Sequence, residues 1–249
     1  MPGQPAWLSP EPGAPFPPAA TALDMPEGLL AIGGDLSPER LLTAYRHGIF
    51  PWSSAGQPLL WWSPDPRMVF RTDRVHLSRR FLRGLARSDW TVRADHCFES
   101  VVAACAEAPR PGQDGTWITA GMRAAYAALH HLGHAHSIEV LDRDGRLVGG
   151  LYGVAVGRMF FAESMFSAES GGSKVALGAL AHRLAAWGWP LVDAQLETPH
   201  LRRLGAEAWP RPRFLAAISR LVDREGVPGA WRVAFGTLPA ADLAGVPPS

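Results

Sequence analysis

The stretch HSIEVLDRDGRLVGGLYGVAVGRMFFAESMFS, residues 136–167, contains three apolar runs that are separated by two turn signals. The pair Asp144-Gly145 favours a tight hairpin turn, and Gly157 permits a second reversal because glycine readily adopts a positive φ. Strands joined by such short turns are antiparallel neighbours. The stretch therefore predicts an antiparallel meander of three strands at the centre of the fold.

Helical and extended patterns continue on both sides of this meander. The predicted elements are helices at 77–88, 96–107 and 120–132 before it, and a helix over 172–188, a strand over 190–195 and a helix near 212–225 after it. Antiparallel strands that are surrounded by helices indicate an α+β (mixed α/β) fold. We expect a central, largely antiparallel sheet flanked by helices, with the functional site where its central strands splay.

The first 65 residues differ from the rest of the chain because they are rich in proline, glycine and tryptophan. They contain one clear helix signal, with Ser37 as N-cap, Pro38 at the first helical position and Gly48 as the stop. The change in composition predicts a small Pro/Trp-rich N-terminal domain over 1–65 and a larger domain over 66–249.

The overall composition is that of an ordinary globular protein, with 47% hydrophobic and 19% charged residues in 249. No basic segment followed by an apolar one opens the chain, and no run of eighteen apolar residues follows, so we expect a cytoplasmic protein without a membrane partner. Four histidines lie between 130 and 136, but Gly133 is expected to separate them, and no metal site is predicted. Cys97 and Cys105 would lie about 12 Å apart in a helix, too far for a disulfide.

Positive charge is concentrated in one segment, although the net charge is only +1. Residues 67–93 contain eight arginines and two acids. Arg79, Arg83 and Arg87 recur at every fourth position and are expected to share one helical face. This face is either a solvated surface or a surface that follows a phosphate backbone.

Three tryptophans lie in a proline-rich segment that predicts a loop. Trp61 and Trp62 are expected to join the core of the small domain, whereas Trp52 is a candidate platform for a nucleic-acid base.

Glu163 stands in the third predicted strand among phenylalanine and methionine side chains. Burial of an ionised carboxylate without a partner costs several kcal/mol or forces it to take up a proton. Glu163 must therefore be exposed, paired or used in function. A pairing with a nearby arginine, such as Arg158, is the structural alternative to a functional role.

The short strand LVDAQ, residues 191–195, ends in polar residues. Alternation along a strand places Asp193 and Gln195 on one face and their apolar neighbours on the other. Two polar side chains at the end of an apolar strand can orient an attacking group.

Several longer runs occur in a fixed order between about residue 27 and residue 206. They are PEGLLAIGGDLSPERLLTAYRHGIFPW, LWWSPDPR, TWIT, AYAALHHLGHAHSIEV, LVGGLYGVAVGRMFFAESMFS, SK, VDAQ and HLRRLGA. Together they closely resemble the leucyl/phenylalanyl-tRNA-protein transferase family. The resemblance implies a GNAT-like acyltransferase fold for the larger domain. It also implies transfer of Leu or Phe from aminoacyl-tRNA to the N-terminal Arg or Lys of a protein, which marks that protein for degradation. Methionine is a third candidate donor, and no cofactor is implied.

The same resemblance suggests roles for the polar residues. It implies that Asp193 orients Gln195, that Gln195 positions the amine, and that Glu163 pairs with a cationic amine of the donor or the acceptor. An aminoacyl ester is already activated, so the site needs no covalent nucleophile but must position the amine and manage one proton.

The resemblance also suggests where the donor binds. The tRNA backbone is expected along Arg79, Arg83 and Arg87, and the terminal adenosine near Trp52 and Trp117. The pocket for the leucyl or phenylalanyl side chain is expected to be lined by Leu151, Phe160, Met165, Leu177 and Val192.

Two other classes of protein are alternatives. A CoA-dependent N-acyltransferase could share the fold, but RLVGGL, residues 146–151, has leucine where the pyrophosphate loop R/Q-x-x-G-x-G/A requires glycine or alanine. A tRNA-binding protein without catalytic activity would account for the arginines and the loop tryptophans.

Overall fold

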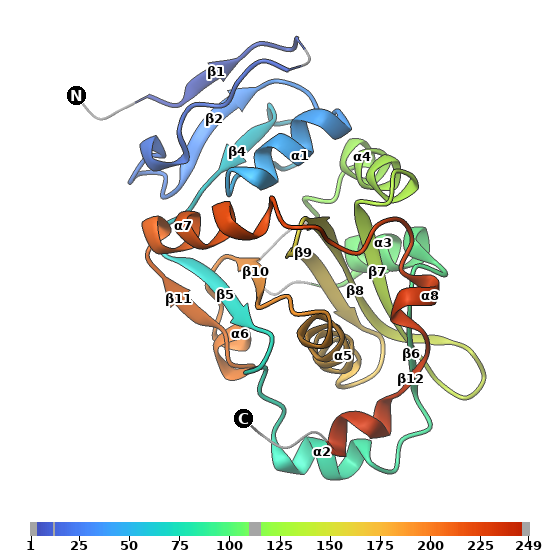
Figure 1. Cartoon of the computed structure of the whole chain (residues 1–249). Coiled ribbons are helices and arrows are strands. Elements are labelled where there is room, and N and C mark those ends of the chain that lie inside the picture. The colour runs from blue at the N-terminus through green and yellow to red at the C-terminus, as the bar shows by residue number, and fades with distance from the viewer. Residues whose placement is uncertain (1–3, 12, 110–115, 246–249) are drawn as a thin grey trace.

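The computed structural model describes residues 4–11, 13–109 and 116–245, and its strands form two sheets (Figure 1). The small sheet consists of β1 (Ala6–Leu8), β2 (Leu29–Gly33), β3 (Phe50–Pro51) and β4 (Leu60–Trp62), in the order β1-β2-β4-β3. The large sheet consists of β5 (Arg67–Arg71), β6 (Thr91–Ala94), β7 (Ala135–Leu141), β8 (Leu147–Val156), β9 (Met159–Ser167), β10 (Leu191–Gln195), β11 (Glu207–Trp209) and β12 (Leu238–Pro239). Its order is β11-β5-β10-β9-β8-β7-β6-β12.

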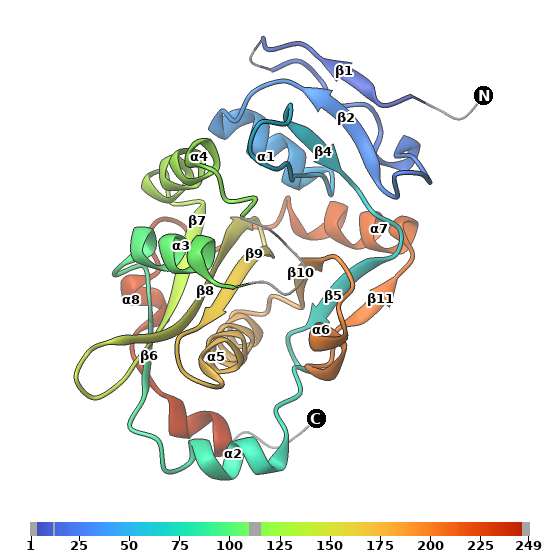
Figure 2. The same cartoon turned by 180° about the vertical axis from the view of Figure 1, so that it is seen from behind.

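Helices lie on both sides of the large sheet, and the first helix of the chain lies beside the small sheet (Figures 1 and 2). They are α1 (Pro38–Arg46), α2 (Arg79–Leu85), α3 (Phe98–Glu107), α4 (Ala120–His131), α5 (Gly172–Ala186), α6 (Pro199–Arg203), α7 (Arg211–Leu221) and α8 (Arg232–Phe235), with 3-10 turns η1 (Ala19–Thr21) and η2 (Ala240–Gly245). None of the helices in the described part of the chain has the length and apolar content that a bilayer crossing requires.

The predicted meander is confirmed as β7, β8 and β9. The β7–β8 turn is fixed by Asp142, whose carboxylate accepts hydrogen bonds from the backbone N–H groups of Asp144 and Arg146. Gly157 has a φ of 58° at the β8–β9 turn. Every neighbouring pair of the large sheet is antiparallel except β9 and β10. The predicted fold class, mixed α/β with a largely antiparallel central sheet, is therefore confirmed.

The parallel pair β9–β10 is short. Its register joins Val192 to Phe160 and Asp193 to Phe161. Beyond these residues β9 continues beside β8, while β10 ends at Gln195. The two central strands thus separate at their carboxyl ends.

Alternation along the strands separates two buried clusters of the large sheet. Phe161 and Tyr152 belong to the cluster that also contains residues of α1, α3, α4 and α7. Phe160 and Leu151 belong to the cluster that contains α5, α8 and η2. Since α1 belongs to the small N-terminal region, that region contributes directly to the first cluster.

The caps of α1 follow the sequence prediction. The Ser37 side chain accepts a hydrogen bond from the backbone N–H of Arg40, Pro38 is the first helical residue, and Gly48 has a φ of 72° just after the helix. Local sequence signals were sufficient here because each cap depends on neighbouring residues.

Other local predictions were wrong. The helix predicted over 77–88 ends at Leu85, and Arg87 lies in the following turn, where its N–H bonds the carbonyl of Gly84. A glycine in the last turn weakens a helix, which explains the early end.

Trp61 and Trp62 lie in β4 rather than in a loop, because β4 pairs with both β2 and β3. Trp61 is fully buried, as expected for core.

Candidate active site

Glu163 is placed by an irregularity in β9. Tyr152 of β8 pairs with Ser164 and the next residue, Gly153, pairs with Ala162, so Glu163 is the extra residue of a β-bulge. The acid meets the side chains of Tyr45 from α1 and Tyr126 from α4. The bulge thus turns one carboxylate of a core strand toward helices that come from distant parts of the chain.

Glu163 is buried and fully engaged in hydrogen bonds. Its Oε1 lies 2.8 Å from the Tyr45 hydroxyl and 2.8 Å from Nε2 of Gln195, and its Oε2 lies 2.6 Å from the Tyr126 hydroxyl. The two hydroxyl oxygens are 2.8 Å apart. Arg158, the candidate structural partner, instead donates to the carbonyl of Glu225. The three partners of Glu163 within the described part of the chain are neutral groups.

This environment changes the acidity of Glu163. Burial raises the pKa of its carboxyl group to about 7, although the hydrogen bonds from Tyr126, Tyr45 and Gln195 oppose the rise and the nearby charge of Asp193 adds to it. Burial also raises the pKa of both tyrosines well above the usual value. A carboxyl group with a pKa near 7 can exchange a proton at neutral pH.

Gln195 reaches Glu163 because the end of β10 is irregular. The register of β10 against β5 shifts between Asp193 and Gln195, and Gln195 has a φ of 60°. The backbone here is therefore not a regular strand, although the predicted division of the side chains is kept: Val192 and Ala194 pack against the second cluster, whereas Asp193 and Gln195 contact Arg67 and Glu163. Asp193 holds Gln195 through the main chain instead, since its Oδ1 accepts the backbone N–H of Gln195 at 2.9 Å.

The charge of Asp193 is compensated by Arg67 of β5. Nε and Nη2 of Arg67 donate to the two oxygens of Asp193 at 2.8 and 2.7 Å, and both side chains are fully buried. Arg67 also donates to the carbonyl of Gly48, and its guanidinium lies 4.7 Å from the ring centres of Phe50 and Phe214. No local pattern marks Arg67, because its partner is 126 positions away.

The five residues predicted to line an aminoacyl pocket lie together in the second cluster. Leu151, Phe160, Leu177 and Val192 are buried there, and Met165 packs against them. Their face of the sheet is that of α5, whereas Glu163 faces Tyr45 and Tyr126, so the acid and these apolar residues approach the strand separation from two sides. Their role as a pocket stays a prediction.

The two tryptophans predicted to lie near the terminal adenosine are both partly buried against the first cluster. Trp52 follows β3, and its ring makes an edge contact with Trp62 at 5.7 Å. Trp117 lies just before α4, the helix that carries Tyr126. Both therefore border the cluster that contains the tyrosines of the site.

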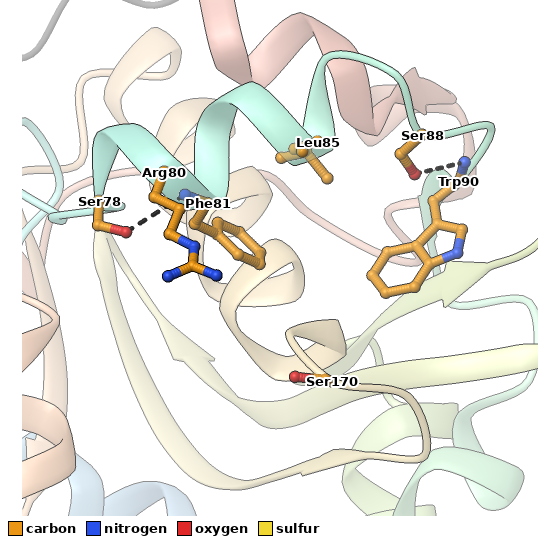
Figure 3. Close-up of a pocket in the computed structure, with 8 residues that line it drawn as sticks. Ser78, Arg80, Phe81, Leu85, Ser88, Trp90 and Ser170 are labelled. Atoms are coloured by element: carbon orange, nitrogen blue, oxygen red, sulfur yellow. Dashed lines mark hydrogen bonds between the residues drawn. The ribbon is translucent and has the colours of Figure 1, made fainter.

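The predicted backbone-binding arginines lie on and after α2. Arg79, Arg83 and Arg87 are exposed. Beside them, α2 and the loop that carries Ser170 border a hollow of about 430 Å³ (Figure 3). Apolar and polar residues both line this hollow. The lining residues are Ser78, Arg80, Phe81, Gly84, Leu85, Ser88, Trp90 and Ser170.

One of the four histidines between 130 and 136 belongs to a buried polar contact. His136 is buried, and its Nδ1 lies 2.8 Å from Oδ2 of Asp95. Within the described residues, no group of three or more His, Cys, Asp or Glu side chains is arranged to hold a metal ion. Cys97, which is the N-cap of α3 rather than part of the helix, and Cys105 are not joined by a disulfide.

Fold and site together define a mixed α/β protein with a buried acid and an amide side chain that meet where two central strands separate. Two family models match the chain: "Leucyl/phenylalanyl-tRNA protein transferase" over residues 69–219 and the N-terminal domain of the same family over residues 34–65. The chain belongs to the leucyl/phenylalanyl-tRNA-protein transferase family.

Curated relatives cover nearly the whole chain. A leucyl/phenylalanyl-tRNA-protein transferase of Xanthomonas euvesicatoria is 65% identical over 240 residues, which are 96% of each chain. A relative of the same name from Xylella fastidiosa is 60% identical over 243 residues, 98% of this chain and 100% of its own.

Solved structures give partial matches. The structure of L-PGS from Bacillus licheniformis matches with a TM-score of 0.40 and 10% identity, over 80% of this chain and 72% of its own. A GCN5-related N-acetyltransferase from Kribbella flavida matches with a TM-score of 0.38 and 12% identity, over 70% and 61%.

Proposed function

We propose that the protein is an aminoacyltransferase that moves leucine or phenylalanine from aminoacyl-tRNA to the N-terminal Arg or Lys of acceptor proteins, with methionine as a third donor. Family membership supports the reaction class. The observation that carries the assignment of the site is the contact between Gln195 and Glu163, 2.8 Å across the separated ends of β9 and β10. We also propose that the chain divides into domains 1–65 and 66–249 and that the protein is cytoplasmic.

The chemistry of the site suits this reaction. The ester of an aminoacyl-tRNA is activated, so the amine can attack it directly once it has lost a proton. An α-amino group has a pKa of about 7.7–8.0, close to the value of about 7 for Glu163, and such matching favours proton transfer near neutral pH. Gln195 positions the amine, and Glu163 pairs with it or takes its proton.

The donor is held by the surfaces around the site. Trp52 and Trp117 stack near the terminal adenosine, and the exposed arginines of α2 contact the tRNA backbone. The apolar residues behind β9 and β10, with Phe160 and Val192 at their centre, receive the leucyl or phenylalanyl side chain. The apolar character of this cluster would make such a pocket selective for apolar side chains of suitable shape.

The test is single-turnover transfer of leucine from charged tRNA to an Arg-ended peptide at saturating enzyme. We expect Gln195→Ala and Glu163→Gln each to slow transfer by about 10²–10⁴-fold with nearly unchanged tRNA affinity, because neither residue is proposed to contact the nucleic acid. Gln57→Ala, at an exposed glutamine of the β3–β4 loop, is the matched control and should transfer at the wild-type rate.

Near wild-type rates for both site variants would contradict the assignment of the site. Tight tRNA binding without any transfer by the wild-type protein would instead support the non-catalytic alternative. Acetyl-CoA binding measured by calorimetry would support the CoA-dependent alternative, which the curated relatives do not favour.

A further inference from the structure

Three oxygen contacts around Glu163 form a closed ring. Oε1 of Glu163 contacts the Tyr45 hydroxyl at 2.8 Å, the Tyr45 hydroxyl contacts the Tyr126 hydroxyl at 2.8 Å, and the Tyr126 hydroxyl contacts Oε2 at 2.6 Å. Each contact has the length of an O–H···O hydrogen bond and therefore needs one hydrogen. The two tyrosines supply only two. The third contact is a hydrogen bond only if the carboxyl group carries a proton.

With that proton in place, every group of the ring donates once and accepts once. One oxygen of the acid donates to Tyr126, Tyr126 donates to Tyr45, and Tyr45 donates to the other oxygen of Glu163. That second oxygen also accepts Nε2 of Gln195 at 2.8 Å. An ionised Glu163 would leave two hydroxyl oxygens 2.8 Å apart without a hydrogen between them.

The charges around the ring favour the same state. Asp193 of β10 is paired with Arg67 of β5, and Tyr45, Tyr126 and Gln195 are neutral partners. Tyr152 of β8, whose ring centre is 5.4 Å from that of Tyr126, adds another acidic group and no cation. Among the described residues around the ring, an ionised Glu163 would thus be a second buried negative charge with Arg67 as the one arginine, which is unfavourable in a medium of low dielectric constant.

We propose that Glu163 is protonated in the free protein and that its proton completes a closed hydrogen-bond ring with Tyr45 and Tyr126. The two tyrosines are positioning residues, because they fix the orientation of the acid and the place of its proton. The rise of the pKa of Glu163 to about 7 through burial agrees with this geometry.

A consequence follows if the proposed function holds and a cationic amine pairs with Glu163. A neutral acid cannot form an ion pair, so the ammonium group can dock only when the ring loses its proton. The balanced step is R–NH₃⁺ plus Glu163–COOH giving the R–NH₃⁺···⁻OOC–Glu163 pair plus one H⁺ released to solvent. Tyr45, Tyr126 and Gln195 then donate hydrogen bonds to the carboxylate of Glu163. These bonds stabilise the negative charge with which the ammonium group pairs.

Infrared spectroscopy tests the ring without any substrate. At pH 6 an ordinary glutamate is ionised, because its pKa is about 4.3. We expect a protonated carboxyl band at pH 6 that disappears with a midpoint near pH 7 and is absent from Glu163→Gln. Tyr45→Phe should move the band to higher frequency, because a carbonyl oxygen that loses a donor has a stiffer C=O bond.

The control is Glu139→Gln. Glu139 is also fully buried, but Arg93 donates to it, so this variant should keep the band. The proposal is overturned if no band at pH 6 depends on Glu163, or if Tyr45→Phe and Tyr126→Phe both leave its frequency unchanged. If Glu163→Gln fails to fold, wild-type protein with ¹³C-labelled glutamate replaces it. A band that titrates near pH 7 and comes from a glutamate must shift in frequency with the label, and a band that does not shift overturns the proposal.

Calorimetry tests the displacement of the proton. The probes are a 3′-amide analogue of leucyl-adenosine and its counterpart with a hydroxyl group in place of the α-amine. At pH 6, in buffers of different ionisation enthalpy, we expect the amine analogue to release close to one proton per molecule bound and the hydroxy analogue to release none. Binding of both without proton release overturns the displacement. Binding of neither contradicts the proposed function, and the infrared band then decides the ring by itself.

Discussion

Asp193 and Glu163 are two buried carboxylates whose surroundings differ in charge. Asp193 receives a bidentate hydrogen bond from Arg67, whereas Glu163 is hydrogen-bonded to two hydroxyl groups and an amide. A buried acid is stable as an anion when a cation lies against it, and otherwise its proton is retained. Asp193 therefore has a buried counter-charge, whereas burial raises the pKa of Glu163 to about 7.

The Arg67–Asp193 pair leads to a prediction about stability. Asp193→Asn leaves Arg67 buried without its counter-charge, so we expect the free energy of unfolding to fall by about 3–5 kcal/mol. Urea denaturation followed by tryptophan fluorescence measures the change. Asp73→Asn removes the partner of Arg71 in an exposed ion pair and should cost no more than about 1 kcal/mol.

Equal losses for these two variants would contradict the structural importance of the buried pair. The prediction also affects transfer assays, because an Asp193 variant loses activity partly through the loss of folded protein. Rates for such variants must be measured under conditions where the protein is fully folded.

At the scale of elements, the sequence predicted best what depends on neighbouring residues. The meander β7–β8–β9 and the helix α1 were predicted because their turns and caps are set by a few adjacent residues, such as Asp144-Gly145 and Ser37. The short strands β4 and β11 were missed because they exist only through pairing with distant strands. The segment after α7, which forms α8, β12 and η2, was missed for the same reason.

The residues of the candidate site also differ in how far the sequence alone could indicate them. Glu163 was selected because an acid among apolar residues is visible in the sequence itself. Its partners Tyr45 and Tyr126 were not, since they lie 118 and 37 positions away and an isolated tyrosine on a helix gives no signal. Gln195 was selected, but its φ of 60° depends on a bulge that simple alternation cannot predict.

The segment that begins at α8 is attached to the large sheet by a buried polar cluster. Asp95 accepts hydrogen bonds from Nδ1 of His136 at 2.8 Å and from the backbone N–H groups of Trp231 and Ser137. The ring of Trp231 stacks on His136 with their centres 3.8 Å apart. Burial lowers the pKa of His136 below its usual value despite the hydrogen bond to Asp95. Burial alone would raise the pKa of Asp95, but the hydrogen bond with His136 and the other donors lower it.

This cluster predicts a loss of stability in mild acid. Because the pKa of His136 is lowered in the folded state, the unfolded chain binds a proton first as the pH falls below about 6.5. Stability contributed by neutral His136 is therefore present above pH 6.5 and decreases toward its folded-state pKa, with a slope of at most about 1.4 kcal/mol per pH unit. The contribution of Asp95 is lost only at lower pH, as the pH falls through its own lowered pKa.

His136→Asn tests this expectation, since the amide keeps a donor for Asp95 but does not titrate. We expect its free energy of unfolding to depend less on pH between 7 and 5 than that of the wild type. The exposed His131→Asn is the matched control and should follow the wild-type curve. Parallel curves for His136→Asn and the wild type would show that the buried histidine does not couple folding to pH.

At the scale of the whole molecule, arginines collect along one recessed strip. A hollow of about 610 Å³ between β5 and α7 is lined by Arg71, Arg213, Arg220 and Arg224, among others. It shares Thr72 and Asp73 with a neighbouring hollow of about 860 Å³, which reaches Leu77 and Leu82 at α2. The second hollow thus ends at α2, the helix that carries the exposed Arg79 and Arg83. With a net charge of only +1 in the whole chain, this clustering concentrates positive potential on one surface.

The α2 arginines give a prediction for the nucleic-acid partner. If Arg79, Arg83 and Arg87 contact phosphates, replacing all three with Gln should weaken tRNA binding and reduce the slope of log affinity against log salt by about one for each lost contact. Because Arg87 lies beyond the end of α2, a reduction of about two would assign the contacts to Arg79 and Arg83, the pair that shares the helix. The measurement is a titration of tRNA by fluorescence anisotropy over a range of salt concentrations.

A double replacement of Arg143 and Arg146 with Gln, in the exposed β7–β8 turn, removes charge away from α2 and should leave the slope unchanged. An unchanged slope for the α2 variant would mean that its arginines form an ordinary solvated face and that the backbone is held elsewhere along the strip.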